Sequence, residues 1–257
     1  MKTVILAGGY GTRLSEYTEE IPKPMVKIGD KPILWHVMSC YANYGYKDFI
    51  VALGYKGEKI KEYFLNYKIL SDDFTINLAT GQVTTITNNN DKDWNITLVD
   101  TGVSSMTGGR IKRLKSFLGD EDFMLTYGDG LANVNIYKLL ETHSKNKSLV
   151  TLSAVRPPAR FGNLETSREG LVKSFTEKSQ LKTGFINGGF FVMNPKFIDY
   201  IEDDNTVLEG KPLELAANKK EVSFYKHEDF WQCMDTKRDK DYLESLISEN
   251  EFPWLTK

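Results

Sequence analysis

The sequence has few cysteines, no long apolar run and no excess of one charge. Cys40 and Cys233 stand far apart without CxxC or Cys/His ligand spacing, which excludes a disulfide framework and a structural zinc site. No segment approaches about 18 apolar residues, and the apolar part of "MKTVILAGG" is shorter than that of a signal peptide, so we expect a cytoplasmic protein with no membrane partner. Lys and Arg total 33 against 35 for Asp and Glu, which provides no overall field for nucleic acid.

Short apolar runs alternate with helical patterns along the chain. Residues 3–7 form an apolar run that ends at glycines, as a buried parallel strand does, and a helical pattern follows Pro32 and stops at Gly45. Residues 49–53 and 60–67 repeat this order of strand and helix. The order is typical of βαβ units, so we predict an α/β fold with a Rossmann-like, three-layer, mixed and mostly parallel sheet.

Residues 72–99 have a different texture, with three short β-patterned runs, "FTINLA", "VTTIT" and "NITLV", joined by turn-rich connectors. We predict an inserted β-hairpin region here, within a single domain of residues 1–257, because a chain of this length can bury one large α/β core. Phe74, Ile76 and Leu78 alternate with polar residues and have no obvious helix to cover them. We therefore expect these strands at a subunit interface.

A glycine-rich loop follows the first predicted strand in "LAGGYGTRL", and Lys23 stands between two prolines shortly after it. Glycines let the backbone approach a ligand and present N–H groups to an anion, and the Arg13 guanidinium can bind two phosphate oxygens at once. The GxxxxGK[ST] spacing is absent, and Leu14 stands where a dinucleotide fingerprint needs glycine. These features favour a polyphosphate ligand and argue against an NAD-dependent oxidoreductase.

The glycine loop and "PKPMV" together resemble the signature of the sugar nucleotidyltransferase family. Later motifs fall in the family's order over nearly the whole chain: "WNITLVDTG", "SSMTGGRIKR", "TYGDG", "RFG", "EK", "INGGFFV" and "FWQCMDT". The resemblance implies that a sugar 1-phosphate oxygen attacks the α-phosphorus of a nucleoside triphosphate in line and pyrophosphate leaves. The stretch "DTGVSSMTGGR" is most similar to members that use CTP, which implies CTP and α-D-glucose 1-phosphate as substrates, CDP-glucose as product and a homo-oligomer, with a hexamer suspected.

The residues expected at the site carry over from the same motifs. Arg13 and Lys23 are the expected catalytic residues, near the pyrophosphate and the α-phosphate. Asp129, which ends an apolar strand between two glycines, and Asp235 are the expected Mg²⁺ ligands. The expected nucleotide-binding residues are Leu6, Ala7, Gly8, Gly9, Gly11, Thr12, Thr101, Ser105, Arg110 and Gly128. The expected sugar-phosphate-binding residues are Glu177, Lys178, Asn187 and Gly188, within a sugar-binding and C-terminal portion of residues 156–257.

Each of these assignments has an alternative that involves no ligand. Asp129 alone suits a turn, and Asp235 alone suits the N-cap of the helix that "TKRDKDYLESLI" predicts. Arg110 can belong to a charged surface run, and Lys178 can be an ordinary solvated lysine. Ser179 follows Lys178 where relatives often have proline, so a different sugar 1-phosphate stays open, as does a nucleotide-sugar sensor that binds without turnover.

Overall fold

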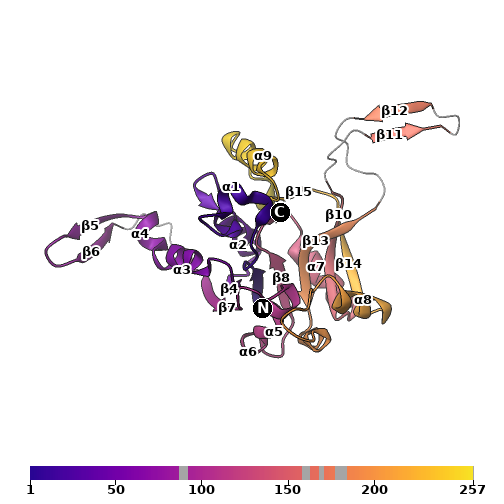
Figure 1. The fold of residues 1–257 in the computed structure, drawn as a ribbon, viewed down its shortest axis with the longest axis horizontal. Coiled ribbons are helices and arrows are strands. Elements are labelled where there is room, and N and C mark those ends of the chain that lie inside the picture. The colour runs from indigo at the N-terminus through magenta and orange to yellow at the C-terminus, as the bar shows by residue number, and fades with distance from the viewer. Residues whose placement is uncertain (87–91, 158–162, 168–170, 177–183, 257) are drawn as a thin grey trace.

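A seven-stranded sheet forms the centre of the chain. The computed structural model describes residues 1–86, 92–157, 163–167, 171–176 and 184–256. The sheet order is β14-β10-β13-β8-β1-β4-β7 (Figure 1). The bounds of its strands are β1 Thr3–Leu6, β4 Asp48–Leu53, β7 Asn95–Asp100, β8 Phe123–Tyr127, β10 Val150–Val155, β13 Ile186–Met193 and β14 Val222–His227.

The sheet is mixed and mostly parallel, as the alternation of strand and helix patterns predicts. Strand β1 pairs in parallel with β4 and β8, β4 with β7, and β10 with β14, whereas β13 runs antiparallel to both β8 and β10. The parallel strands of the first half therefore end at the same edge, around Leu6, Leu53 and Tyr127. In α/β folds this carboxyl edge is where ligands bind.

Helices cover both faces of the sheet and give the predicted three layers. Helices α2 (Ile33–Ala42), α3 (Gly57–Leu65), α7 (Ile136–Asn146) and α9 (Lys237–Ser248) contribute to one hydrophobic cluster. Helices α5 (Thr107–Arg113), α6 (Lys115–Leu118) and α8 (Lys211–Asn218) contribute to the other. Strand β4 shows why both layers form: Phe49, Val51 and Leu53 lie in the first cluster, and Ile50 and Ala52 in the second, because successive strand residues point to opposite faces.

The region 72–99 divides differently from the prediction of three inserted strands. Strands β5 (Asp73–Asn77) and β6 (Gln82–Ile86) form an antiparallel hairpin that projects from one end of the molecule in Figure 1. The third predicted strand became β7, which pairs with β4 at the edge of the main sheet. Its apolar residues Ile96 and Leu98 pack against the core, so burial decided its place.

Short elements complete the chain. They are the helices α1 (Ser15–Thr18) and α4 (Tyr67–Ser71), the 3-10 helices Thr12–Leu14, Lys23–Met25, Pro195–Tyr200 and Pro253–Leu255, and the two-stranded pairs β2 (Lys27–Ile28) with β3 (Lys31–Pro32), β9 (Gly130–Ala132) with β15 (Trp231–Cys233), and β11 (Asn163–Thr166) with β12 (Val172–Thr176). None of the helices in the described ranges is long and apolar enough to span a membrane. The β9–β15 pair matters for the site, because it brings the segment after β8 beside the segment before α9.

Candidate active site

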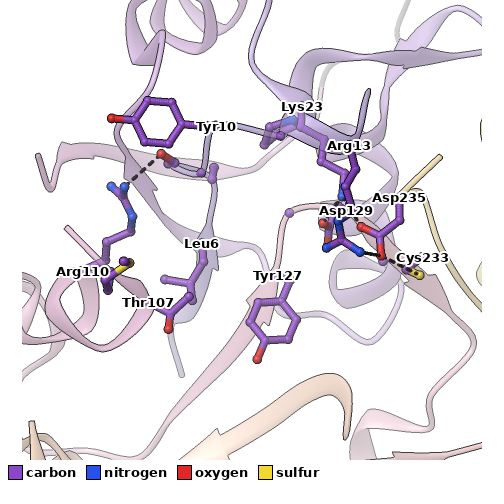
Figure 2. A pocket seen from close by; sticks show the side chains of 18 of the residues that line it. Leu6, Tyr10, Arg13, Lys23, Thr107, Arg110, Tyr127, Asp129, Cys233 and Asp235 are labelled. Carbon is purple, nitrogen blue, oxygen red and sulfur yellow. Dashed lines mark hydrogen bonds and ion pairs between the residues drawn. The ribbon is translucent and has the colours of Figure 1, made fainter. Parts of the chain in front are cut away.

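A cleft of about 600 Å³ opens at the carboxyl edge of β1 and β8 (Figure 2). Fifteen of the predicted site residues line it: Leu6, Ala7, Gly8, Gly9, Gly11, Thr12, Arg13, Lys23, Ser105, Arg110, Gly128, Asp129, Asn187, Gly188 and Asp235. Thr101 lies behind its wall, and Glu177 and Lys178 lie outside the described residues. Residues from six separate segments of the chain therefore meet in one cavity.

Lys23 joins the two carboxylates that the sequence marks as metal ligands. Its Nζ lies 2.6 Å from Oδ2 of Asp129 and 2.7 Å from Oδ1 of Asp235. The three side chains are largely buried, with 11 %, 29 % and 15 % of their surfaces exposed. Figure 2 shows them converging beside Arg13. Asp129 and Asp235 thus converge on one cation, although 106 residues separate them in the chain.

The pKa values of this cluster follow from its charges. Burial acts to lower the pKa of Lys23, but the charge and hydrogen bonds of Asp129 and Asp235 outweigh burial, and the net effect is a raised pKa. Burial likewise acts to raise the pKa of Asp235, and the hydrogen bond and charge of Lys23, with the charge of Arg13, lower it below its usual value. Lys23 and Asp235 therefore both stay ionised at neutral pH.

Local structure fixes each member of the cluster. Lys23 begins a 3-10 helix directly after Pro22, whose extended backbone turns the lysine inward. Asp129 lies in the turn between β8 and β9, as its alternative without a ligand predicts, and its carboxylate contacts Lys23; its role as a metal ligand stays a prediction. Asp235 is not the N-cap of α9, because Thr236 and Asp239 form a capping box there. The alternative that made Asp235 a helix cap is wrong.

Arg13 differs from Lys23 in exposure. Its Nη1 lies 2.8 Å from Oδ2 of Asp235, but 70 % of its side chain is open to solvent. The loop before it turns at Gly11, which has a φ of 64°, in the left-handed region that glycine adopts at no steric cost. Arg13 is thus a cation at the mouth of the cleft that can move to a ligand.

Arg110 is buried and supports the glycine loop. Only 4 % of the residue is exposed, which contradicts its interpretation as part of a charged surface run. Burial lowers the pKa of Arg110. Its guanidinium donates to the Thr101 hydroxyl and to the backbone oxygens of Leu53, Gly102, Gly8 and Val103, at distances of 2.7 to 3.2 Å.

The acceptors of Arg110 are uncharged, and within the described residues no carboxylate pairs with it. A cation without an ion-pair partner in the described residues therefore lies under the loop that the sequence assigns to the nucleotide. Thr101 serves this arrangement from behind the wall, since its hydroxyl accepts from Arg110 and donates to Leu53 O at 2.7 Å. A Cβ on Gly8 would lie 2.1 Å from Nη1 of Arg110, so Arg110 also explains why glycine stands at position 8.

The two glycines before Arg110 pack against the segment 204–206. A Cβ on Gly109 would lie 2.4 Å from the Asp204 oxygen, and one on Gly108 would lie 2.7 Å from the Thr206 oxygen. The N–H groups of both glycines donate to Thr206 O. The motif "SSMTGGRIKR" thus owes its glycines to backbone packing, which holds α5 and therefore Arg110 in place.

Three comparisons bear on the family. The nucleotidyl transferase family model matches residues 2–245. The chain belongs to this family. It is 50% identical to "Glucose-1-phosphate cytidylyltransferase" from Salmonella typhimurium over 257 residues, 100% of this chain and 99% of that protein. It is 44% identical to "Probable glucose-1-phosphate cytidylyltransferase" from Bacillus subtilis over 255 residues, 99% of each chain.

A solved structure shares the fold. The crystal structure of HddC from Yersinia pseudotuberculosis superposes with a TM-score of 0.69 at 24% identity, over 96% of this chain and 99% of that one. The predicted sugar nucleotidyltransferase membership and α/β fold class are therefore confirmed.

Tyr127 and Glu209 of this nucleotidyl transferase family member are not among the residues that the sequence predicts at the site. Tyr127 lines the cleft, and Glu209 lies behind Tyr127 and accepts its hydroxyl hydrogen bond. Tyr127 stands in the quoted motif "TYGDG" and could have been singled out there. Glu209 carries no signal in the sequence, because only tertiary structure brings it to Tyr127. Trp231 also lines the cleft and donates from Nε1 to Gly188 O at 2.8 Å, whereas its neighbour Phe230 packs against the core.

Cys233 lines the cleft, and its environment disfavours the thiolate that a nucleophile needs. Burial, with the charges of Asp235 and Asp129, raises the pKa of its thiol to about 12. The thiol stays protonated at neutral pH and contacts Asp235 at 3.7 Å. The chemistry of the cleft thus rests on charges, which suits transfer between phosphates better than covalent catalysis.

Proposed function

We propose that this chain transfers a cytidylyl group from CTP to α-D-glucose 1-phosphate and releases CDP-glucose and pyrophosphate. The observation that carries the proposal is the 50% identity, over the whole chain, to a relative named for this reaction. The cleft supports it chemically, because it gathers three cations, two carboxylates and a glycine loop where two phosphate ligands must meet.

The charges suggest how the residues divide the work. Lys23 and Arg13 balance Asp129 and Asp235 in the cleft, so only the buried Arg110 is left to offset the charge of two phosphate substrates. Lys23 would then turn to the α-phosphate and Arg13 to the leaving pyrophosphate, where negative charge grows in the transition state. The glycine loop and Arg110 would hold the nucleotide, and Asn187 and Gly188 the sugar.

A divalent cation would supply the missing positive charge, and we propose Mg²⁺. In the described ranges no group of three or more His, Cys, Asp or Glu side chains could hold a metal ion. The donor set is instead the two carboxylates of Asp129 and Asp235, which already meet at the Lys23 cation. This fits Mg²⁺, which takes oxygen ligands, binds through one or two carboxylates and completes its shell with phosphate oxygens and water. Bound there, the ion would neutralise charge on the phosphates.

A homo-oligomer completes the proposal. The β5–β6 hairpin leaves Phe74, Ile76 and Val83 with 43 %, 46 % and 39 % of their surfaces exposed. The register places Phe74, Ile76 and Val83 on one face of the hairpin, since Ile76 pairs with Val83. We propose that a second copy of the chain covers this face.

A pyrophosphate-release screen tests the substrates. CTP, UTP, dTTP, ATP and GTP are each combined with several sugar 1-phosphates, and kcat/KM is compared. We expect CTP with glucose 1-phosphate to give the highest value. Far higher kcat/KM with UTP or dTTP would refute the choice of base, and nucleotide binding without turnover would favour the sensor.

The metal ligands have their own test. Asp129→Asn and Asp235→Asn keep the shape of each side chain but remove its charge, so we expect Mg²⁺-dependent turnover to collapse while the circular dichroism spectrum is retained. Mn²⁺ binding in the presence of nucleotide, followed by electron paramagnetic resonance, should weaken in both variants. Asp199→Asn, on a surface side chain that is 71 % exposed, is the control.

A further inference from the structure

A chain of hydrogen bonds crosses one wall of the cleft and ends on Glu209. Asn187 Nδ2 donates to the Tyr127 hydroxyl at 3.3 Å, and the Tyr127 hydroxyl donates to Oε1 of Glu209. The other carboxylate oxygen of Glu209 accepts from the Thr107 hydroxyl at 2.7 Å. Thr107, Tyr127 and Asn187 all line the cleft, whereas Glu209 does not. Glu209 therefore acts on the cleft only through its neighbours.

The directions of these bonds follow from the chemistry of the groups. Glu209 as a carboxylate can only accept, so both hydroxyl protons point to it. Asn187 is oriented because its Oδ1 accepts from Gly189 N at 2.9 Å, which turns its amide nitrogen toward Tyr127. The Tyr127 ring is held as well, since it packs on Phe191 and on Gly189, where a Cβ would lie 2.6 Å from Cδ2 of the ring.

These hydrogen bonds leave the Tyr127 oxygen able only to accept a further hydrogen bond. A phenol has a single proton, and Glu209 takes it. The remaining capacity of the Tyr127 oxygen is to accept, and Asn187 uses it only at the long distance of 3.3 Å. Burial and the charge of Glu209 raise the pKa of Tyr127, so the phenol stays neutral.

We propose that Glu209 is a positioning residue that fixes the Tyr127 oxygen as a hydrogen-bond acceptor, so that the cleft selects a sugar 1-phosphate carrying a hydroxyl group at the position facing Tyr127. The proposal rests on the function proposed above and names a source of its sugar specificity. A fluorine or hydrogen at that position has no proton to donate, and Tyr127 cannot turn its own proton toward it while Glu209 holds that proton.

The experiment measures kcat/KM for glucose 1-phosphate and for its 2-, 3-, 4- and 6-deoxyfluoro analogues. The wild-type chain is compared with Glu209→Ala, Tyr127→Phe and the double variant. Glu202→Ala is the matched control, because Glu202 is exposed in the same segment and pairs with Lys211. Dividing each variant's ratio by the wild-type ratio cancels the effect of fluorine on the reactivity of the sugar.

We expect the wild type to prefer hydroxyl over fluorine by roughly tenfold at one ring position because of this bond. Glu209→Ala and Tyr127→Phe should bring that preference below about twofold at the same position, and the double variant should match the single ones, because all three break one link. The other three positions and the Glu202→Ala variant should keep the wild-type ratios. Unchanged ratios in Glu209→Ala and Tyr127→Phe would overturn the inference. An equal loss of the preference for hydroxyl at all four positions would also overturn it, because that result marks a purely structural role.

Failure of the proposed function gives a different result. It shows in the wild type, as turnover of another nucleotide or none. The same ratios are then measured with the nucleotide that is used, or as calorimetric affinities where binding occurs without turnover. Loss of the preference for hydroxyl over fluorine in the variants would still support the inference. Retention of that preference would overturn it.

Discussion

Among single residues, Lys23 is a charged side chain held in a largely buried position. Its ammonium lies between two carboxylates at hydrogen-bonding distance and is largely buried. Removing one partner from such a cluster leaves charges that water only partly solvates. Arg13 joins the same cluster but keeps 70 % of its side chain in solvent, where an ion pair contributes little to stability. Replacing Lys23 should therefore affect both stability and catalysis, whereas replacing Arg13 should affect catalysis alone.

This difference gives the first prediction. Arg13→Ala and Lys23→Ala should each lower kcat by about 10²-fold or more, because both oppose charge that develops in the transition state. Only Lys23→Ala should also lower the melting temperature. Steady-state kinetics and differential scanning calorimetry measure the two effects. Near-normal kcat in either variant would make that side chain an ordinary cation, and equal melting temperatures would contradict the burial argument.

The second prediction concerns pH. The folded chain lowers the pKa of Asp235, so the stability from this ionised carboxylate is present above its unfolded pKa of about 3.9 and is lost as pH falls through the folded value. The raised pKa of Lys23 acts oppositely: its contribution is present below the ordinary value of 10.5 and is lost as pH rises through the folded value. Asp235→Asn should therefore lower the free energy of unfolding by a constant amount between about pH 5 and pH 9.

Urea unfolding at a series of pH values measures this difference. It should shrink below about pH 4, where the wild type loses the same charge. The surface variant Asp199→Asn provides the control. A difference between wild type and Asp235→Asn that persists undiminished into acid would mean that charge is not its origin.

At the scale of elements, two neighbouring glycines of the glycine loop differ in their packing. Gly8 is packed against Arg110, whereas a Cβ on Gly9 would meet nothing within 4 Å. Gly8 and Gly9 are therefore glycine for different reasons, although both stand in the same sequence motif. The buried guanidinium explains Gly8, and the anion binding proposed for the loop would account for the open Gly9.

The third prediction uses this pair. Gly8→Ala should lower the free energy of unfolding by about 1–3 kcal/mol, because the methyl group must displace a hydrogen-bonded guanidinium. Gly9→Ala should leave the free energy of unfolding within about 0.5 kcal/mol of wild type, since the site is open. Urea denaturation without nucleotide gives both values. Equal free energies of unfolding for the two variants would show that the Arg110 guanidinium moves aside without cost. That result would refute its role in holding the loop.

At the scale of the whole molecule, local patterns predicted the sheet, and the resemblance to the family's motifs supplied most of the residues that line the cleft. Apolar runs ending in glycines marked β1 and β8, and the edge where parallel strands end follows from their direction. Sequence patterns could not predict what depends on contacts between distant segments. The burial of Arg110, the link from Glu209 to Tyr127 and the pairing of β7 with β4 are all of this kind. The charged run around Arg110 even offered a solvent-exposed alternative for it, which its burial contradicts.

The β5–β6 hairpin is a part of the molecule whose apolar side chains the single chain leaves exposed. Strands β5 and β6 bury none of their residues, yet one face carries Phe74, Ile76 and Val83. A two-stranded hairpin is marginally stable on its own in water, and exposed apolar strand residues mark interaction sites. A second copy that covers this face would stabilise the hairpin and bury its apolar side chains at once.

The fourth prediction follows from this face. Wild type at micromolar concentration should be an oligomer by multi-angle light scattering, and Ile76→Asp should shift it toward the monomer, because a charge would be buried without a partner. Thr75→Asp is the matched control, since Thr75 pairs with Thr84 on the opposite face of the same hairpin, which is polar except for Ile86, and should leave the oligomer intact. A monomeric wild type would remove the proposed interface. If Thr75→Asp dissociated the oligomer as fully as Ile76→Asp, charge on the hairpin rather than its apolar face would govern assembly.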